Sequence, residues 1–224
     1  MVGGRPVGDP VRGPAARRPG REPRVGRFVR LAPVDPAGDA ESLWRATHDG
    51  SDAAEAVWTY LAYGPFADAA AMCAWLDTLV PSEDPLFLTA HTDAGPSGIV
   101  SFMSIEPEMR RIELGHIWYA LAAQRSEANT ETVFLMLREA FEELGYRRVE
   151  WKCDALNARS RAAAERLGFT FEGVFRQHMI VKGRNRDTAW FSIVDDEWPE
   201  LRAAFERWLE APARERPSLA SLRP

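Results

Sequence analysis

The sequence predicts one α/β domain built on a mixed, largely antiparallel β-sheet with helices on both faces. Three observations support this fold class: helical patterns come first, three strands joined by short turns follow, and a strand–helix–strand unit and a hairpin complete the chain. Turns of a few residues join antiparallel neighbours, whereas a strand–helix–strand unit makes a parallel pair. A mixed sheet between helical layers accommodates both connections.

The composition narrows the class of protein. The 224 residues are 46% hydrophobic and 27% charged, as in an ordinary soluble globular protein. A net charge of −5 argues against nucleic acid or a membrane as partner, and no apolar run approaches the roughly 20 residues that a membrane-spanning helix needs. Cys73 and Cys153 lack metal-ligand spacing, so we expect no metal site and a reducing compartment, the cytoplasm.

The two ends of the chain differ from its middle. Residues 1–26 are dominated by Gly, Pro and Arg, with no apolar segment of the kind a secretory signal contains. We expect this segment to be a disordered tail, residues 27–210 to form the domain, and residues 211–224, again rich in Pro and Arg, to form a second loose tail. The sequence shows no internal repeat and no second domain.

The first half of the domain is predicted as one strand, three helices and a meander. Alternation of polar and apolar residues predicts the strand at 27–31. Ser51 can cap a helix whose start carries two acidic residues, which suits the positive end of the helix dipole. The other predicted helices are 39–47 and 67–79, and the predicted strands of the meander are 86–90, 98–105 and 111–121.

The stretch from Glu113 to Phe175 contains the predicted parallel unit. A helix is predicted at 130–144, where Asn129 or Thr130 can supply the N-cap and Gly145 ends the helix. The other predicted elements are a strand at 148–153, a helix at 159–167, extended segments at 169–181 and 188–194, and a terminal helix from 197. The loops 122–129 and 154–160 both follow carboxyl ends of strands, where ligands bind in open α/β sheets.

Several segments in this stretch resemble the GNAT acetyltransferase superfamily, in particular its RimJ/RimL-like branch, which acetylates protein N-termini or small amines. The segments that carry the resemblance are Phe141–Glu150, Asp154–Ser160, Arg166–Phe169, Glu172–Gly173 and Arg186–Asp187. Their order and spacing are more specific than any one of them, and the similarity spans about residues 27–209.

The resemblance implies an N-acetyltransferase that uses acetyl-CoA, or another acyl-CoA such as succinyl-CoA. It would transfer the acyl group to a primary amine of a small molecule or a protein N-terminus by direct attack. The pantetheine arm would pair with splayed strands at 113–121 and 148–153, and the pyrophosphate would lie at the N-terminus of helix 130–144. The residues implied in cofactor binding are Leu121, Ala123, Gln124, Arg125, Ser126, Ala128, Asn129, Thr130, Asn157 and Ser160.

One loop departs from the family pattern, which usually reads Gln/Arg-x-x-Gly-x-Gly/Ala. Glu127 and Asn129 stand where the two small residues are expected, and Glu127 brings bulk and negative charge beside the expected pyrophosphate. Either Glu127 points to solvent while Arg125 and backbone amides hold the phosphates, or cofactor binding is weakened or lost. In the second case the chain would be a binding or regulatory module with the GNAT fold.

The family analogy gives Ser160 the role of the acid that protonates the departing thiolate, with Asn157 bonded to the cofactor arm. Both residue types suit local capping of the following short helix equally well.

Three residues are candidates for the base that deprotonates the amine. Glu113 and His116 are three positions apart on one strand, so they face opposite sides unless a bulge intervenes. His178 lies near the position where RimL-like enzymes carry a glutamate, although Met179 holds that position itself. A histidine near its natural pKa can accept a proton at neutral pH, and water-relayed deprotonation is the alternative.

Aromatic residues are the candidates for the wall of the acceptor pocket. Trp58, Tyr60, Tyr63 and Trp118 could form it, and core packing is the competing interpretation for each. The basic turn 182–186 could meet an acidic acceptor or simply be solvated. Homodimers are common among relatives, and the sequence leaves the oligomeric state open.

Overall fold

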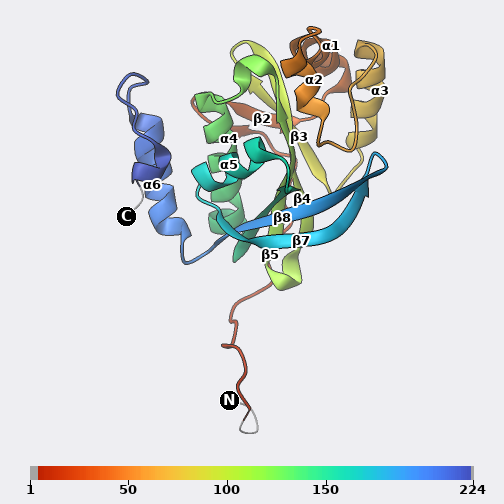
Figure 1. The fold of residues 1–224 in the computed structure, drawn as a ribbon. Coiled ribbons are helices and arrows are strands. Elements are labelled where there is room, and N and C mark those ends of the chain that lie inside the picture. Colours follow the sequence, from red (N-terminus) through yellow and green to blue (C-terminus); the bar gives the residue numbers. More distant parts are fainter. Residues whose placement is uncertain (1–4, 223–224) are drawn as a thin grey trace.

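The computed structural model describes residues 5–222, which form an eight-stranded open sheet flanked by helices (Figure 1). The strand order is β1-β2-β3-β4-β5-β6-β8-β7, and every neighbouring pair is antiparallel except β5 and β6. The predicted mixed sheet is confirmed. The strands are β1 (Arg24–Val25), β2 (Arg30–Pro33), β3 (Leu86–Thr92), β4 (Gly95–Glu106), β5 (Arg111–Tyr119), β6 (Arg148–Asp154), β7 (Thr170–Val181) and β8 (Arg184–Val194).

The α-helices divide between the two faces of the sheet (Figure 1). Those in the first half of the chain cover one face, and those in the second half cover the other. They are α1 (Pro36–Thr47), α2 (Asp52–Trp58), α3 (Ala69–Leu79), α4 (Glu127–Arg138), α5 (Ala158–Arg166) and α6 (Trp198–Glu210), with shorter helical turns at Pro107–Met109, Leu121–Ala123, Glu139–Leu144 and Leu219–Leu222. No helix within residues 5–222 is both long and apolar enough to cross a membrane.

Each face of the sheet has its own apolar core because side chains alternate along the strands. In β3, Leu86 and Leu88 pack with α4–α6, whereas Phe87 packs with α1–α3. The same alternation is present in β6, since Val149, Trp151 and Cys153 belong to the α4–α6 core. Seven of the eight tryptophans belong to these cores or pack against them, as their large apolar surface favours.

Helix α4 begins earlier than predicted. The sequence favoured Asn129 or Thr130 as its N-cap, but Ser126 caps the helix, because its Oγ accepts a hydrogen bond from the Asn129 amide at 3.3 Å. Glu127 is consequently the first helical residue. The helix continues into the turn Glu139–Leu144 and ends at Gly145, whose φ of 82° is the left-handed conformation predicted for it.

Both end segments contact the domain. Ala16 is 8% exposed, and its amide donates to the Pro107 carbonyl at 3.0 Å. Arg24 forms an ion pair with Glu139, the first residue of the helical turn that follows α4. Near the other end, Leu219 is 1% exposed and belongs to the α4–α6 core. The domain limits of 27 and 210 stay a prediction, whereas these contacts extend the packed part of the chain to both sides of them.

Glu131 in α4 fastens the first strands to the body of the protein. It is 4% exposed, and its carboxylate accepts hydrogen bonds from the amides of Arg27 at 2.8 Å, Phe28 at 2.6 Å and Val29 at 3.0 Å. Hydrogen bonds to a carboxylate are stronger than those between neutral groups. This side chain therefore satisfies the backbone of the turn that leads into β2.

We expect Glu131→Ala to lower the free energy of unfolding by about 3 kcal/mol, because it leaves buried backbone donors without their acceptor. Chemical denaturation followed by circular dichroism measures this change. Glu41→Ala is the control, since Glu41 forms an exposed pair with Arg45 within α1 and should matter little. Equal stability of the two variants would contradict the role of Glu131.

Candidate functional site

The two parallel strands at the centre of the sheet separate part-way along their length. Residues Arg111–Leu114 of β5 pair with Arg148–Trp151 of β6, and the pairing stops there. Beyond this point β5 continues only beside β4, and Lys152–Asp154 of β6 continue only beside β8. The facing edges of Gly115–Tyr119 and Lys152–Asp154 therefore have no ladder partner within the described residues. An extended ligand can add to such edges as another strand.

A β-bulge lies where the separation begins. His116 has a φ of 50°, and the register between β4 and β5 shifts opposite it, between Ile99 and Ser101. The extra residue reverses the alternation of side chains. His116 consequently faces the α1–α3 side, where its ring lies 5.0 Å from that of Phe87, and Glu113 faces the same side. The sequence allowed Glu113 and His116 to share a face only if a bulge lay between them, and that bulge is present.

His116 is held in a buried aromatic setting. Its Nδ1 is 3.3 Å from the hydroxyl oxygen of Tyr63, and the two rings stack at 5.7 Å. Burial, and secondarily the positive charge of Arg186, lower the pKa of His116. The imidazole is therefore neutral at pH 7 and able to accept a proton. Burial raises the pKa of Tyr63, which stays a neutral phenol.

The loop after β6 and the start of α5 form the other side of the opening. Asn157 is the N-cap of α5, because its Oδ1 accepts a hydrogen bond from the Ser160 amide at 3.1 Å, so the capping interpretation holds for Asn157. The Ser160 Oγ accepts a hydrogen bond from the Trp151 Nε1 at 3.0 Å. An indole N–H can only donate, so the hydroxyl proton of Ser160 remains available for another acceptor.

The loop predicted to hold phosphates runs directly into α4. The Gln124 side chain donates to the Tyr119 carbonyl at 3.1 Å, and Arg125 has a left-handed φ of 59°. Ser126 donates to the Ala123 carbonyl at 2.7 Å while it caps the helix. Amides in the first turn of a helix lack intrahelical partners and favour anions. Because α4 begins at Glu127, these amides lie three residues before the predicted helix start.

Arg166 of α5 links this helix to the start of α4. Its guanidinium donates to the Thr130 hydroxyl at 3.0 Å and to the Asn129 Oδ1 at 3.4 Å. Thr130 and Asn129 therefore contribute to the packing of α4 on α5 in addition to their predicted place near the cofactor. Ala128, also predicted at this site, is buried in the α4–α6 core.

Glu127, the departure from the family pattern, has a cationic partner. Its carboxylate accepts a hydrogen bond at 2.8 Å from Arg216, which lies in the segment after α6. A backbone hydrogen bond at Glu127 itself, and then the bond from Arg216, lower the pKa of this carboxyl, so it is ionised at neutral pH. No sequence pattern indicates a role for Arg216, because it lies in a Pro- and Arg-rich segment without periodicity.

The three predicted catalytic residues do not form one cluster. Ser160 contacts Trp151 in the α4–α6 core, whereas Glu113 lies on the opposite face and bonds to Lys152 at 2.9 Å. Burial raises the pKa of Glu113, and the Lys152 ammonium opposes that shift. No described hydrogen bond joins any two of Ser160, Glu113 and His178 within residues 5–222.

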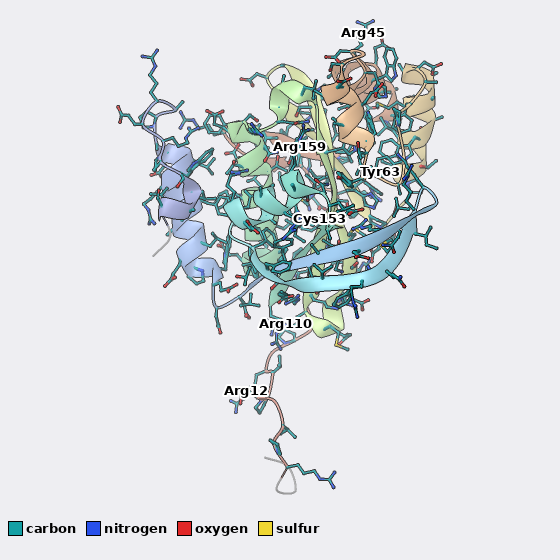
Figure 2. All side chains as sticks on the ribbon, viewed as in Figure 1. Arg12, Arg45, Tyr63, Arg110, Cys153 and Arg159 are labelled. Carbon is teal, nitrogen blue, oxygen red and sulfur yellow. The ribbon has the colours of Figure 1, made fainter. Side chains whose placement is uncertain are left out.

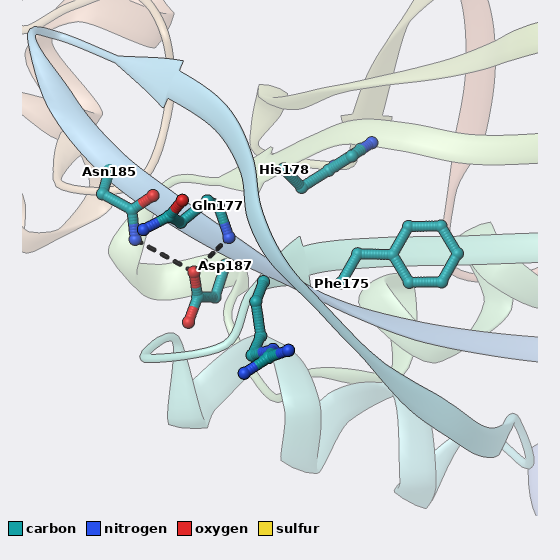
Figure 3. Close-up of a pocket in the computed structure, with 6 residues that line it drawn as sticks. Phe175, Gln177, His178, Asn185 and Asp187 are labelled. Carbon is teal, nitrogen blue, oxygen red and sulfur yellow. Dashed lines mark hydrogen bonds between the residues drawn. The ribbon is translucent and has the colours of Figure 1, made fainter.

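His178 lies on the exposed face of the β7–β8 hairpin. Its Nδ1 is 2.9 Å from the Thr188 hydroxyl, and with Phe175 and Asp187 it lines an open pocket of about 910 Å³ (Figure 3). Gln177, whose φ of 50° is also left-handed, donates its amide hydrogen to Asp187 at 2.7 Å and lines this pocket. The pocket is polar and shallow, and it lies on the edge strand of the sheet rather than between β5 and β6.

The aromatic residues predicted to line the acceptor pocket fall into two groups, those in the core and those beside the opening between β5 and β6. Trp58 and Trp118 are 1% and 4% exposed, and their rings pack at 5.0 Å, so both are core residues at the base of the α1–α3 side. Tyr63 is half-buried beside His116, and Figure 2 shows it on the α2–α3 side of the molecule, with Cys153 and Arg159 toward β6 and α5.

Two contacts bring distant segments together around this side of the site. The Tyr60 hydroxyl donates to the Leu156 carbonyl at 3.1 Å, which links the segment after α2 to the loop before α5. The Lys182 ammonium donates to the carbonyls of Trp58 at 3.1 Å, Tyr63 at 3.3 Å and Gly64 at 2.8 Å. Lys182 therefore holds the tip of the β7–β8 hairpin against the α2–α3 segment (Figure 1), and its charge is not free for an acceptor.

Comparison with known proteins agrees with this arrangement. A model of the acetyltransferase (GNAT) domain matches residues 29–170. The chain belongs to the GNAT acetyltransferase family. The prediction of this family, and of an enzyme, is confirmed. The helix α4, the separated strands and the loop before α5 all lie inside the matched residues, whereas α6 and Arg216 lie beyond them.

The most informative relatives are bacterial. A GCN5-related N-acetyltransferase from Brucella melitensis is 41% identical, covers 94% of this chain and 98% of its own, and superposes with a TM-score of 0.89. A GNAT-family protein from Chromobacterium violaceum is 37% identical over 89% of this chain and 98% of its own, with a TM-score of 0.76. YdaF of Bacillus subtilis, provisionally described as a ribosomal N-acetyltransferase, is 31% identical over 106 residues. That match spans 47% of this chain and 57% of YdaF, and it agrees with the RimJ/RimL-like branch.

We expect Arg186→Gln to raise the pKa of His116, because it removes a positive charge that disfavours the imidazolium. Proton NMR titration of the imidazole measures the pKa, with His116→Asn identifying the resonance. Arg184→Gln, on an exposed residue of the same strand, is the matched control and should leave the titration unchanged. A His116 pKa that is equal in both variants would contradict the assigned electrostatics.

Proposed function

We propose that the protein is an acyl-CoA-dependent N-acetyltransferase that transfers an acetyl group to a primary amine by direct attack. The observation that carries this proposal is the separation of β5 from β6 after Leu114 and Trp151, which leaves two extended backbone edges facing each other. A pantetheine arm carries amide groups that can pair with such edges. No other described pair of neighbouring strands inside the sheet offers an opening that ends at a helix N-terminus.

The residues present fit a coenzyme A thioester. Its pyrophosphate requires donors, which the amides at the start of α4 and the Arg125 side chain would supply. Leu121, Ala123 and Gln124 connect the end of β5 to the cap of α4, which supports their proposed contributions to cofactor binding. When bound, the cofactor supplies the activated acyl group. Acetyl is the proposed group, and succinyl is the alternative.

Proton transfer is assigned to residues on both sides of the opening. We propose His116 as the base for the amine, because it sits on the bulge at the opening and is neutral at pH 7. Glu113 and His178 are the less favoured bases, since Glu113 is held by Lys152 and His178 lies on the outer hairpin. Ser160 is the proposed acid, because its hydroxyl proton is not used by Trp151.

The acceptor is proposed to enter from the α1–α3 side. Tyr63, half-buried beside His116, would contact the amine, while Trp58 and Trp118 would support this wall from the core. The description of YdaF supports a protein N-terminus as the acceptor, and a small amine is the alternative. Cys73 and Cys153 are free thiols, which fits the cytoplasm as the proposed compartment.

The second candidate function was a GNAT-fold binding module without cofactor chemistry, which Glu127 suggested. The ion pair between Glu127 and Arg216 weakens the argument for such a module, because the positive charge of Arg216 neutralises the Glu127 carboxylate within the protein. The enzyme is therefore the better supported proposal.

We expect acetyl-CoA to raise the melting temperature of the protein, because a ligand that binds only the native state stabilises it by mass action. Differential scanning fluorimetry across a concentration series measures the shift, with free adenine as the control ligand. If neither acetyl-CoA nor succinyl-CoA binds at millimolar concentration, the proposed function is wrong.

We expect Ser160→Ala to lower kcat roughly 10²-fold, because a general acid contributes about this much to a proton transfer. Thiol release from acetyl-CoA in the presence of peptide and amine acceptors provides the assay. Ser42→Ala, on an exposed position of α1, is the control and should retain full turnover. Unchanged turnover in Ser160→Ala, with acetyl-CoA still bound, would remove Ser160 from the mechanism.

A further inference from the structure

The segment after α6 folds back onto the start of α4. Arg216, in this segment, keeps only 9% of its side chain exposed. Its guanidinium lies 4.4 Å from the centre of the Trp208 ring and 5.8 Å from that of Phe28, and it donates to the Ala211 carbonyl at 3.0 Å. The guanidinium also donates the 2.8 Å hydrogen bond to the Glu127 carboxylate. Aromatic faces and a carbonyl therefore hold one cation in place.

A well-buried cation at this position requires a physical reason. Burying a charged group is costly unless a partner compensates it. The carboxylate of Glu127 is that partner, although the Nε of Arg216 is buried without a hydrogen-bond acceptor among the described groups. A side chain that served only to anchor the tail could have been apolar, since Leu219 already inserts into the core a few residues later.

The effect of the pair on α4 is electrostatic. Glu127 occupies the first turn of the helix, where the helix dipole and the amides that the Ser126 cap does not use attract anions. An uncompensated carboxylate there would repel the phosphates of a nucleotide cofactor. The guanidinium of Arg216 cancels this charge, so the amides can accept a second, external anion.

We propose that Arg216 is a positioning residue of the cofactor site. It neutralises Glu127 and thereby restores the anion-binding capacity of an α4 start that lacks the small residues usual in its family. The C-terminal segment is then part of the site, although it lies outside the residues that match the family model. This inference rests on the proposed function, because it assumes a cofactor with a pyrophosphate group.

A double-mutant cycle tests the inference through CoA affinity, measured by isothermal titration calorimetry on the full chain. We expect Arg216→Ala to weaken CoA binding about tenfold at low salt, because it exposes the Glu127 charge to the phosphates. The double variant Arg216→Ala/Glu127→Gln should bind CoA within about twofold of the wild type, because neither charge remains. Arg214→Ala, an exposed arginine of the same segment, is the matched control and should bind like the wild type.

Two further measurements separate an electrostatic role from a structural one. The loss in Arg216→Ala should shrink as salt is added, since ions screen exposed charges. CoA and 3′-dephospho-CoA should lose affinity by the same factor, because both carry the pyrophosphate. Melting temperatures of all variants establish that they are folded under the conditions of the titration.

The outcomes distinguish this inference from the proposed function. If CoA fails to bind the wild type, the proposed function and the inference are both wrong. If CoA binds the wild type and Arg216→Ala equally, only the inference is wrong. A double variant as weak as Arg216→Ala would also overturn it, because the loss would then not depend on the Glu127 carboxylate.

Discussion

The early end of the pairing between β5 and β6 is the constraint on which the rest of this site depends. After Leu114 and Trp151 the two parallel strands follow different neighbours, β5 remaining with β4 and β6 with β8. The bulge at His116 bends β5 at that point, and its extra residue places both Glu113 and His116 on the α1–α3 side of the sheet. The bulge thus lies where the sheet opens and places the His116 ring on the α1–α3 side, beside Phe87.

Helix α4 is the second organising element, because remote parts of the chain converge on its first two turns. Glu131 binds the backbone that leads into β2, Arg166 brings in α5, and Arg216 brings in the C-terminal segment. The proposed cofactor site is thus assembled from segments separated by most of the chain length. Charges within the protein set the anion affinity of the helix start, and its amides supply the donors.

The structure confirms most elements that periodicity predicted and corrects those that depended on local detail. Gly145 has the left-handed φ predicted at the end of its helix, Gly168 after α5 has one as well, and the strand alternation around Trp151 is present. The predicted start of α4, residue 130, is three residues too late. Ser, Asn and Thr are all suitable N-caps, and the sequence cannot choose among them. The bulge at His116 has no sequence signal, since left-handed histidine is uncommon and depends on its surroundings.

The sequence by itself determined the fold class and the order of the elements, because hydrophobic periodicity and glycine positions are local properties. The family was indicated by the resemblance of its segments to known acetyltransferases, and the match over residues 29–170 confirms it. The sequence also indicated which two loops flank the site. Only the tertiary structure decided which side chains meet there, since His116 with Tyr63, and Glu127 with Arg216, are paired across long separations. Contacts between distant segments follow from packing and compensated charge, which no local pattern encodes.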